Sequence, residues 1–307
     1  MTKSPTISQF NKQFPDDGTC LEHLMRVKYG KRFDCPKCDR EARYYRVASR
    51  RCYECEHCGH QVYPTAGTPF ERTRTSLKDW FYVMFLFCAS RNGVSAKEIQ
   101  RQIGVTYKTA WRMGHEIRKY MGWVDGEGPI GGKGRNPVEI DKAFIGGRDK
   151  QGQDDKAIVL GMIERDGEII TRVIPDRREV TVAREIIGVV SYGARVATDE
   201  AKAFSNLRVY GYAHATVNHS AKEYVRGEVH TNSIEGFWSV LKRGLSGTHV
   251  WVSPKHLSKY LGEFEYRHNL RGQPYLMFDL LLAAFQRPAR ASGLTWRAGE
   301  FQSAAEH

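Results

Sequence analysis

VEIDKAFIGG, residues 138–147, has the pattern of a β-strand whose apolar part ends at an acidic residue, Asp141. The downstream stretch AIVLGMIERDGEIITRVI, residues 157–174, predicts two further strands joined at Asp166-Gly167, a strong hairpin signal. After residue 174, predicted helices and strands alternate along the chain. The predicted order is β-β-β-α-β-α-β-α, which indicates a mixed α/β domain.

The last helix of that order begins in HTNSIEGFWSVLKRGLSG, residues 230–247. Asn232 is its predicted N-cap, and Glu235 three residues later would close a capping box. The helix is expected to end at Gly244 or Gly247. Glu235 and Lys242 lie seven residues apart, so they share one helix face. Glu235 is therefore either a cap or a carboxylate directed at a site.

Three acidic residues in this domain form a candidate site. Asp141 lies in the first strand, and Asp199 follows the fourth strand, RVAT. The first and fourth strands can pair in the middle of the sheet, and a helix packed across it can bring Glu235 to both aspartates. Three carboxylates at one point require a divalent cation, and hard oxygen ligands favour Mg²⁺ or Mn²⁺. Other acids have similar surroundings, namely Asp154, Asp155, Glu139 and Glu200.

Six of the seven cysteines lie between residues 20 and 70, and four of these form two CxxC pairs. The pairs predict a structural zinc site with four thiolate ligands, because each short loop turns two sulfurs toward one point. Cys52 and His57 are close enough in sequence to substitute as ligands. Cys20 and Cys88 are expected to be buried apolar residues. The predicted zinc ligands are Cys35, Cys38, Cys55 and Cys58.

Between the two cysteine pairs, basic and aromatic residues interleave in RYYRVASRR, residues 43–51. This composition suits contact with nucleic-acid phosphates and stacking on bases, so Arg43 and Arg46 are candidate DNA-binding residues. An exposed β-hairpin with charged sides explains the pattern equally well.

GVSAKEIQRQIGVTYKTAWRMGHEIR, residues 93–118, resembles a helix-turn-helix. Ser95 would cap a first helix that holds Ile99 and Ile103 inward, Gly104 would give the turn, and Thr106 would cap the second helix. Residues early in the second helix of this motif reach base edges. A plain helical hairpin is the alternative. The predicted outer face carries Tyr107, Lys108, Arg112 and His115.

The formal net charge of +12 favours a polyanion, nucleic acid before membrane, as the partner, although a solvated basic surface is the alternative. The first residues contain no secretory signal. The most apolar run, Trp80 to Ala89, is too short to span a bilayer. A soluble, cytoplasmic protein is therefore expected.

Three blocks resemble the catalytic blocks of insertion-sequence DDE transposases: VEIDKAFIGG, ATDEAKAFSNL, and the long stretch from residue 230 to 271. The chain is most similar to the subgroup that carries an N-terminal zinc ribbon and a helix-turn-helix, and the resemblance covers roughly residues 20–272. It implies a ribonuclease-H-like fold and Mg²⁺-dependent cleavage and transfer of DNA strands at transposon ends. The catalytic positions of the family fall on Asp141, Asp199 and Glu235, and its DNA-contacting lysine falls on Lys242. Lys142 stands where many relatives carry a second acid.

The resemblance and the composition together predict a multidomain chain. Its parts are an N-terminal segment with zinc ribbon (1–72), a helix-turn-helix domain (73–125), a linker (126–136), a catalytic domain (137–286) and a flexible tail (287–307). The expected partner is double-stranded DNA, the terminal inverted repeats and the target, bound by a homodimer or larger assembly. Two alternatives stay open: a non-catalytic DNA-binding regulator, and a nuclease of the same fold that cuts without joining.

Overall fold

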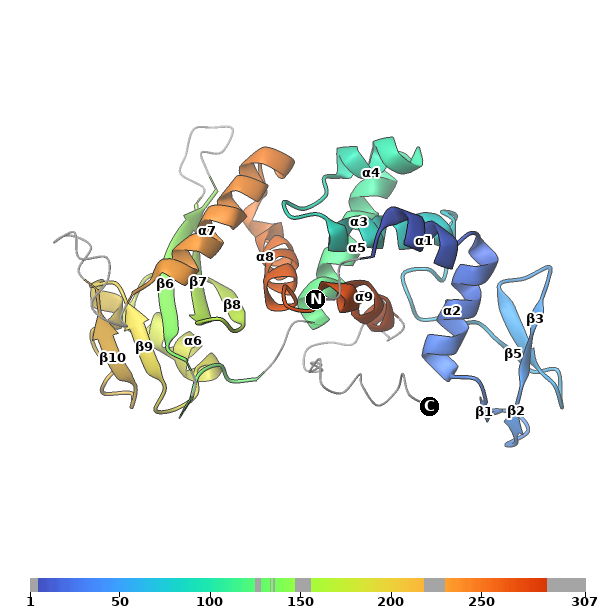
Figure 1. Cartoon of the computed structure of the whole chain (residues 1–307), viewed down its shortest axis with the longest axis horizontal. Coiled ribbons are helices and arrows are strands. Elements are labelled where there is room, and N and C mark those ends of the chain that lie inside the picture. The colour runs from blue at the N-terminus through green and yellow to red at the C-terminus, as the bar shows by residue number, and fades with distance from the viewer. Residues whose placement is uncertain are drawn as a thin grey trace. The chain divides into compact units, whose positions relative to one another are not determined.

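The computed structural model describes residues 5–124, 128–132, 134, 136–146, 156–217 and 230–285 (Figure 1). The contacts between residues divide the chain into two units. The first contains residues 1–90, 96–120 and 273–294, and the second contains residues 91–95, 121–272 and 295–307. The predicted tail, part of the predicted linker, and Asp154 and Asp155 lie outside the described residues.

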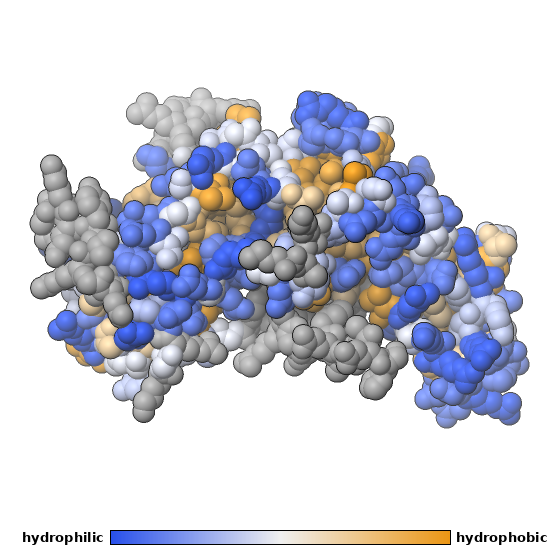
Figure 2. Space-filling model, in the orientation of Figure 1, coloured by the Kyte–Doolittle hydropathy of each residue, from blue (hydrophilic) through white to orange (hydrophobic). Residues whose placement is uncertain are grey.

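The first unit begins with two helices and a set of short antiparallel strands. β1 pairs with β2, and β3, β4 and β5 form a separate three-stranded sheet. The surface over these strands is mostly hydrophilic (Figure 2). The elements are α1 (Ile7–Gln13), α2 (Asp17–Tyr29), β1 (Phe33–Asp34), β2 (Glu41–Ala42), β3 (Tyr44–Val47), β4 (Cys52–Cys55) and β5 (Gln61–Val62).

Four helices and a short 3₁₀ turn complete the first unit around an aromatic core. α9 packs on α3, although the sequence prediction placed this segment with the catalytic domain. The reason lies in its aromatic residues: Phe278 packs against Phe14 and Phe81, and the ring of Phe285 lies 4.1 Å from that of Tyr120. The elements are α3 (Leu77–Ala89), α4 (Ala96–Ile103), α5 (Tyr107–Val124), η3 (Pro274–Leu276) and α9 (Met277–Phe285).

A five-stranded mixed sheet forms the centre of the second unit, in the order β10-β9-β6-β7-β8. β6 runs antiparallel to β7 and parallel to β9, so the predicted pairing of the first and fourth strands is confirmed. The hairpin between β7 and β8 turns at Asp166, whose φ of 60° is the left-handed conformation. The strands are β6 (Val138–Ile145), β7 (Ala157–Glu164), β8 (Ile169–Ile174), β9 (Arg195–Thr198) and β10 (Ala213–Thr216).

Helices cover both faces of this sheet, and each face has its own apolar core. Val138 and Ile140 of β6 face the core that contains α6, whereas Ala143 and Ile145 face the core built with α7 and α8. The predicted helical piece after β9 is a 3₁₀ turn. The elements are α6 (Glu179–Val189), η1 (Lys202–Phe204), α7 (Asn232–Gly244), the π-helical turn η2 (Leu245–His249) and α8 (Pro254–Asn269).

The start of α7 differs from the prediction. Thr231, not Asn232, occupies the N-cap position, and its side chain makes no capping hydrogen bond to the helix backbone. The predicted capping box is therefore wrong. The Thr231 hydroxyl instead donates to the Glu235 carboxylate over 3.1 Å. Within the described parts of the chain, no helix is both long and apolar enough to cross a membrane.

Candidate zinc centre and acidic site

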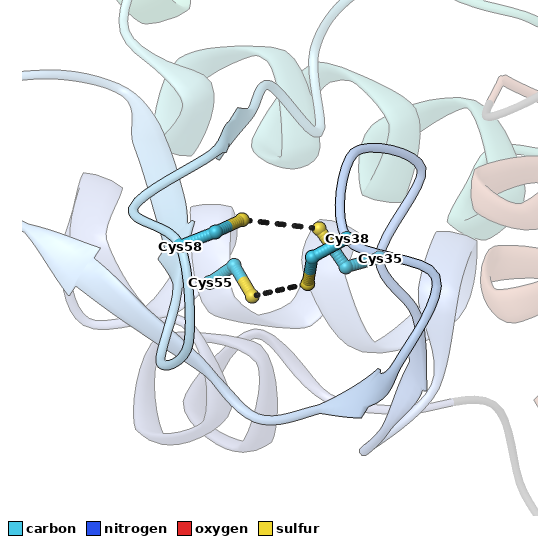
Figure 3. A group of neighbouring side chains, drawn as sticks. All are labelled: Cys35, Cys38, Cys55 and Cys58. Carbon is cyan, nitrogen blue, oxygen red and sulfur yellow. Dashed lines mark hydrogen bonds between the residues drawn. The ribbon is translucent and has the colours of Figure 1, made fainter.

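Two loops of the first unit bring four cysteine sulfurs to one point (Figure 3). Their Sγ atoms all lie within 4.8 Å of one another, with 3.6 Å between Cys35 and Cys58 and 3.9 Å between Cys38 and Cys55. A tetrahedron of Zn–S bonds of roughly 2.3 Å has edges of about 3.8 Å. The four thiols therefore fit a zinc ion, and they leave no position open for a substrate.

The two substitute ligands considered from the sequence do not join this group. Cys52 is fully buried in β4 and lies outside the cluster. His57 Nε2 lies 3.4 Å from the carbonyl oxygen of Glu41 instead. Cys20 is also fully buried, as expected, and burial raises the pKa of its thiol to about 12. Cys88 is only partly buried.

The parallel pair β6 and β9 places two aspartates side by side in the second unit. Ile140 of β6 pairs with Thr198 of β9, so Asp141 and Asp199 are the next residues along each strand direction. The Asp199 carboxylate accepts a hydrogen bond of 3.1 Å from the backbone N–H of Ala201, which fixes the turn after the strand. This adjacency follows from the strand order together with the register of the pair.

Helix α7 crosses the same face of the sheet and carries Glu235 in its first turn. Trp238, one turn further along, is 4% exposed, and its indole N–H donates to the Asp141 carboxylate over 3.1 Å. Its ring lies over Gly161, the residue of β7 that pairs with Asp141. A Cβ at Gly161 would lie 2.5 Å from this ring, so only glycine admits the contact.

Electrostatic interactions link the three predicted acids. Burial raises the pKa of Asp141, and the neighbouring charges of Asp199 and Glu235 add to the shift. Lys142 points to the opposite face, where its Nζ lies 4.1 Å from the centre of the Phe204 ring, and burial lowers its pKa. The negative potential at Asp141 is the kind of environment that a divalent cation relieves.

The three carboxylates are not as close together as the four thiols. Among the residues that the structure describes, only the cysteines form a group of three or more potential ligands with atoms within 4.8 Å of one another. Glu235 is exposed, whereas Asp141 and Asp199 are partly buried. The acidic site thus consists of two partly buried aspartates and one exposed glutamate.

Glu139 is a site residue whose role the sequence analysis missed. It is fully buried and accepts hydrogen bonds from the backbone N–H groups of Ser233 (2.8 Å) and Ile234 (3.2 Å) at the start of α7. Arg165 Nε and His230 Nδ1 lie 3.1 and 3.2 Å from its Oε1. The signal available in the sequence was its position two residues before Asp141, which places both on one strand face.

The candidate DNA-binding residues are exposed. Arg43 directly precedes β3, Arg46 lies within it, and Lys242 lies in the last turn of α7. Tyr107, Lys108 and Arg112 are exposed along the first turns of α5.

Gly104 has the φ of 69° that the predicted turn between α4 and α5 requires, and Thr106 Oγ1 accepts from the Thr109 N–H. His115 does not belong to the outer face, because it is 4% exposed and packs on the Trp111 ring at 3.8 Å. That part of the prediction is wrong. His115 follows the exposed Trp111 by one helical turn, so both lie on one side of α5 and their rings pack on each other.

Together, a four-cysteine zinc centre on short antiparallel strands and an acidic site on a mixed sheet define a metal-binding, multidomain protein. Comparison with known protein families identifies both parts. Residues 132–269 match the ISXO2-like transposase domain, and residues 15–61 match the transposase zinc-ribbon domain. Over these two regions the chain is similar to insertion-sequence transposases, with a transposase zinc ribbon preceding a transposase domain.

One curated relative supports this assignment. The chain is 28% identical over 289 residues to an uncharacterized protein in transposable element ISH50 of Halobacterium salinarum. The similarity covers 86% of this chain and 94% of that protein.

Proposed function

We propose that this chain cleaves DNA at the ends of an insertion sequence and joins them to target DNA, with Asp141, Asp199 and Glu235 as ligands of Mg²⁺ or Mn²⁺. The observation that carries the proposal is the pairing of Ile140 with Thr198, which sets the two aspartates next to each other under the helix that bears Glu235. The five-strand order with β6 and β9 at the centre also supports a ribonuclease-H-like fold for this unit.

The bound metal would activate the attacking oxygen and stabilise the leaving oxygen of a phosphodiester. The residues of the chain supply the ligand set and its orientation: Trp238 holds one Asp141 oxygen, and the Ala201 N–H holds one Asp199 oxygen. In the first step water replaces the 3′ oxygen at a transposon end and leaves a free 3′-hydroxyl. In the second step that hydroxyl attacks a target phosphodiester, and a new 3′-hydroxyl leaves.

In this proposal, the first unit binds the terminal repeat. The zinc ribbon with Arg43 and Arg46, and α5 with Tyr107, Lys108 and Arg112, present exposed basic and aromatic side chains. Lys242 contacts DNA near the cleavage site, since it lies on the same face of α7 as Glu235. A complex of two or more chains would hold two ends together.

The test uses a duplex that carries the inverted repeat flanking the coding sequence, incubated with the purified chain and Mg²⁺ or Mn²⁺. Glu235→Gln should abolish cleavage and joining while binding of the duplex stays unchanged and the melting temperature does not fall, because the glutamine oxygen still accepts from Thr231. Glu200→Gln, an exposed acid next to Asp199, is the matched control and should react normally. Wild-type rates for Glu235→Gln would refute the catalytic assignment, and cutting without joining by the wild type would identify a nuclease.

A further inference from the structure

The buried carboxylate of Glu139 is costly unless its charge is compensated. The structure supplies five hydrogen-bonding or charged groups around it. Two backbone N–H groups and the Ser233 hydroxyl (3.0 Å) come from the start of α7, and Arg165 and His230 lie within 3.2 Å. A negative charge at a helix N-terminus is stabilised by the helix dipole. Glu139 thus accepts hydrogen bonds from the first backbone N–H groups of α7, which the side chain of the N-cap residue, Thr231, does not do.

Glu139 and Asp141 hold α7 at two points along one strand. Residues two apart in a strand point to the same face and lie about 6.6 Å apart along it. Glu139 binds the N–H groups of residues 233 and 234, and Asp141 binds the indole of Trp238. The rise along a helix from 233–234 to 238 is about 6.8 Å. The spacing of the two carboxylates along β6 thus matches the spacing of their two partners along α7, so both contacts can form at the same time.

Glu235 lies between these two attachment points. Without them, the like charges of Asp141, Asp199 and Glu235 would push the start of α7 away from the strand ends. We propose that Glu139 is a positioning residue: by fixing the first turn of α7 on β6, it sets the place of Glu235 relative to the two aspartates. The inference rests on the proposed function, in which these three acids bind a divalent cation.

A matched control exists in the same unit. Glu265 of α8 is 8% exposed and accepts hydrogen bonds from the backbone N–H (2.7 Å) and the hydroxyl of Thr171 on β8. This contact also ties a helix to the sheet through a buried carboxylate, but that helix carries none of the three acids. Glu139→Asp and Glu265→Asp each shorten such a carboxylate by one methylene group and keep its charge.

The experiment measures Mn²⁺ binding to the full-length zinc-loaded chain by electron paramagnetic resonance of free Mn²⁺, beside thermal melting. Mn²⁺ bound at the acidic site is defined as the Mn²⁺ binding that disappears in the double variant Asp141→Asn/Asp199→Asn. Glu139→Asp should weaken it about 10- to 100-fold, the range for residues that orient metal ligands. Glu265→Asp should bind Mn²⁺ within about twofold of wild type, although both variants melt at lower temperature.

The outcomes separate the inference from the proposed function. Wild-type Mn²⁺ affinity in a folded Glu139→Asp protein, or an equal loss in Glu265→Asp, would overturn the positioning role. If Glu139→Asp does not melt cooperatively, Ser233→Ala replaces it, since it removes only the hydroxyl donor to Glu139; it should weaken binding about threefold, and unchanged affinity would overturn the role. A wild-type chain that binds no Mn²⁺ through the aspartates would instead overturn the proposed function.

Discussion

At the scale of single residues, the acidic site is held in an arrangement that opposes its own stability. Asp141 is partly buried beside two like charges, and Lys142, the neighbouring base that interacts with it, has its side chain on the other face of β6. Such an arrangement costs folding free energy in the absence of a cation. Binding of a divalent cation, as proposed above, would offset this cost.

Neutralising Asp141 should stabilise the metal-free protein. Burial raises the pKa of this carboxyl, and a pKa raised by folding means that the ionised group destabilises the folded state at pH values above its usual range. Asp141→Asn keeps an oxygen for the Trp238 indole. In EDTA at pH 7 it should raise the melting temperature by about 2–4 °C, the effect of about 1 kcal/mol in a domain of this size.

The stabilisation by Asp141→Asn should depend on pH. The gain should shrink as the pH falls through the raised pKa of Asp141, because the wild-type carboxyl is then protonated and no longer carries the repelled charge. Glu200→Gln, which removes an exposed charge nearby, should leave the melting temperature within about 1 °C of wild type. An Asp141→Asn protein that melts below wild type in EDTA at pH 7 would contradict the account.

At the scale of elements, the position of α7 depends on close contact with the sheet. Gly161→Ala places a methyl group 2.5 Å from the Trp238 ring, so the ring must move or the strand must shift. This substitution should destabilise the chain by about 1–3 kcal/mol, the usual cost of overpacking. Because the Trp238 indole also donates a hydrogen bond to Asp141, the rate of DNA cleavage should fall together with the stability.

Gly188→Ala is the control for that substitution. Gly188 lies within α6, and apart from its chain neighbours and the adjacent helix backbone, no described atom lies within 4 Å of the place where its Cβ would be added. Alanine there should stabilise the helix by about 0.5–1 kcal/mol. Urea melts of the two variants should therefore shift in opposite directions, and a Gly161→Ala protein as stable as wild type would show that the Trp238 contact is loose.

The zinc centre makes an independent prediction for the ribbon strands. Each of these strands is only two to four residues long, too short to be stable without a cross-link such as a bound metal ion. Purified protein should contain about one zinc ion per chain, and Cys35→Ser with Cys55→Ser should release it. Cys88→Ser, which changes a cysteine outside the cluster, should keep it. Zinc retained after the double substitution would place the metal elsewhere.

Much of this arrangement could be predicted from sequence, because it depends on local patterns. The turn at Asp166, the cysteine spacing and the alternation along β6 are all visible in a few neighbouring residues. The N-terminus of α7 could not be predicted, because its cap comes from Glu139, about ninety residues earlier in the chain. The burial of His115 likewise depends on packing against other helices, which no local pattern specifies.

At the scale of the whole molecule, the first unit is discontinuous in sequence. α9 buries six apolar side chains, Met277, Phe278, Leu280, Leu281, Leu282 and Phe285. At roughly 1.5–3 kcal/mol for each buried side chain, this burial is worth on the order of 10 kcal/mol. That is comparable with the whole net stability of a typical domain.

A chain that ends after Gly272 should therefore lose the first unit as well as its own last helix. It should bind terminal-repeat DNA poorly and expose the aromatic core, which binding of a hydrophobic dye would report. Restoring residues 273–285 as a separate peptide should recover part of the DNA binding. Full-strength DNA binding by the truncated chain would show that the helices preceding α9 are stable alone.

This topology has a consequence for how the protein is made. If the first unit reads the terminal repeat as proposed, a nascent chain could not recognise its element before residues 121–272 had also been synthesised, because α9 follows them in the sequence. A frameshift or nonsense codon anywhere before α9 then yields no decoy that occupies transposon ends without being able to cut them. Damaged copies of the gene would accumulate in a genome without inhibiting intact ones.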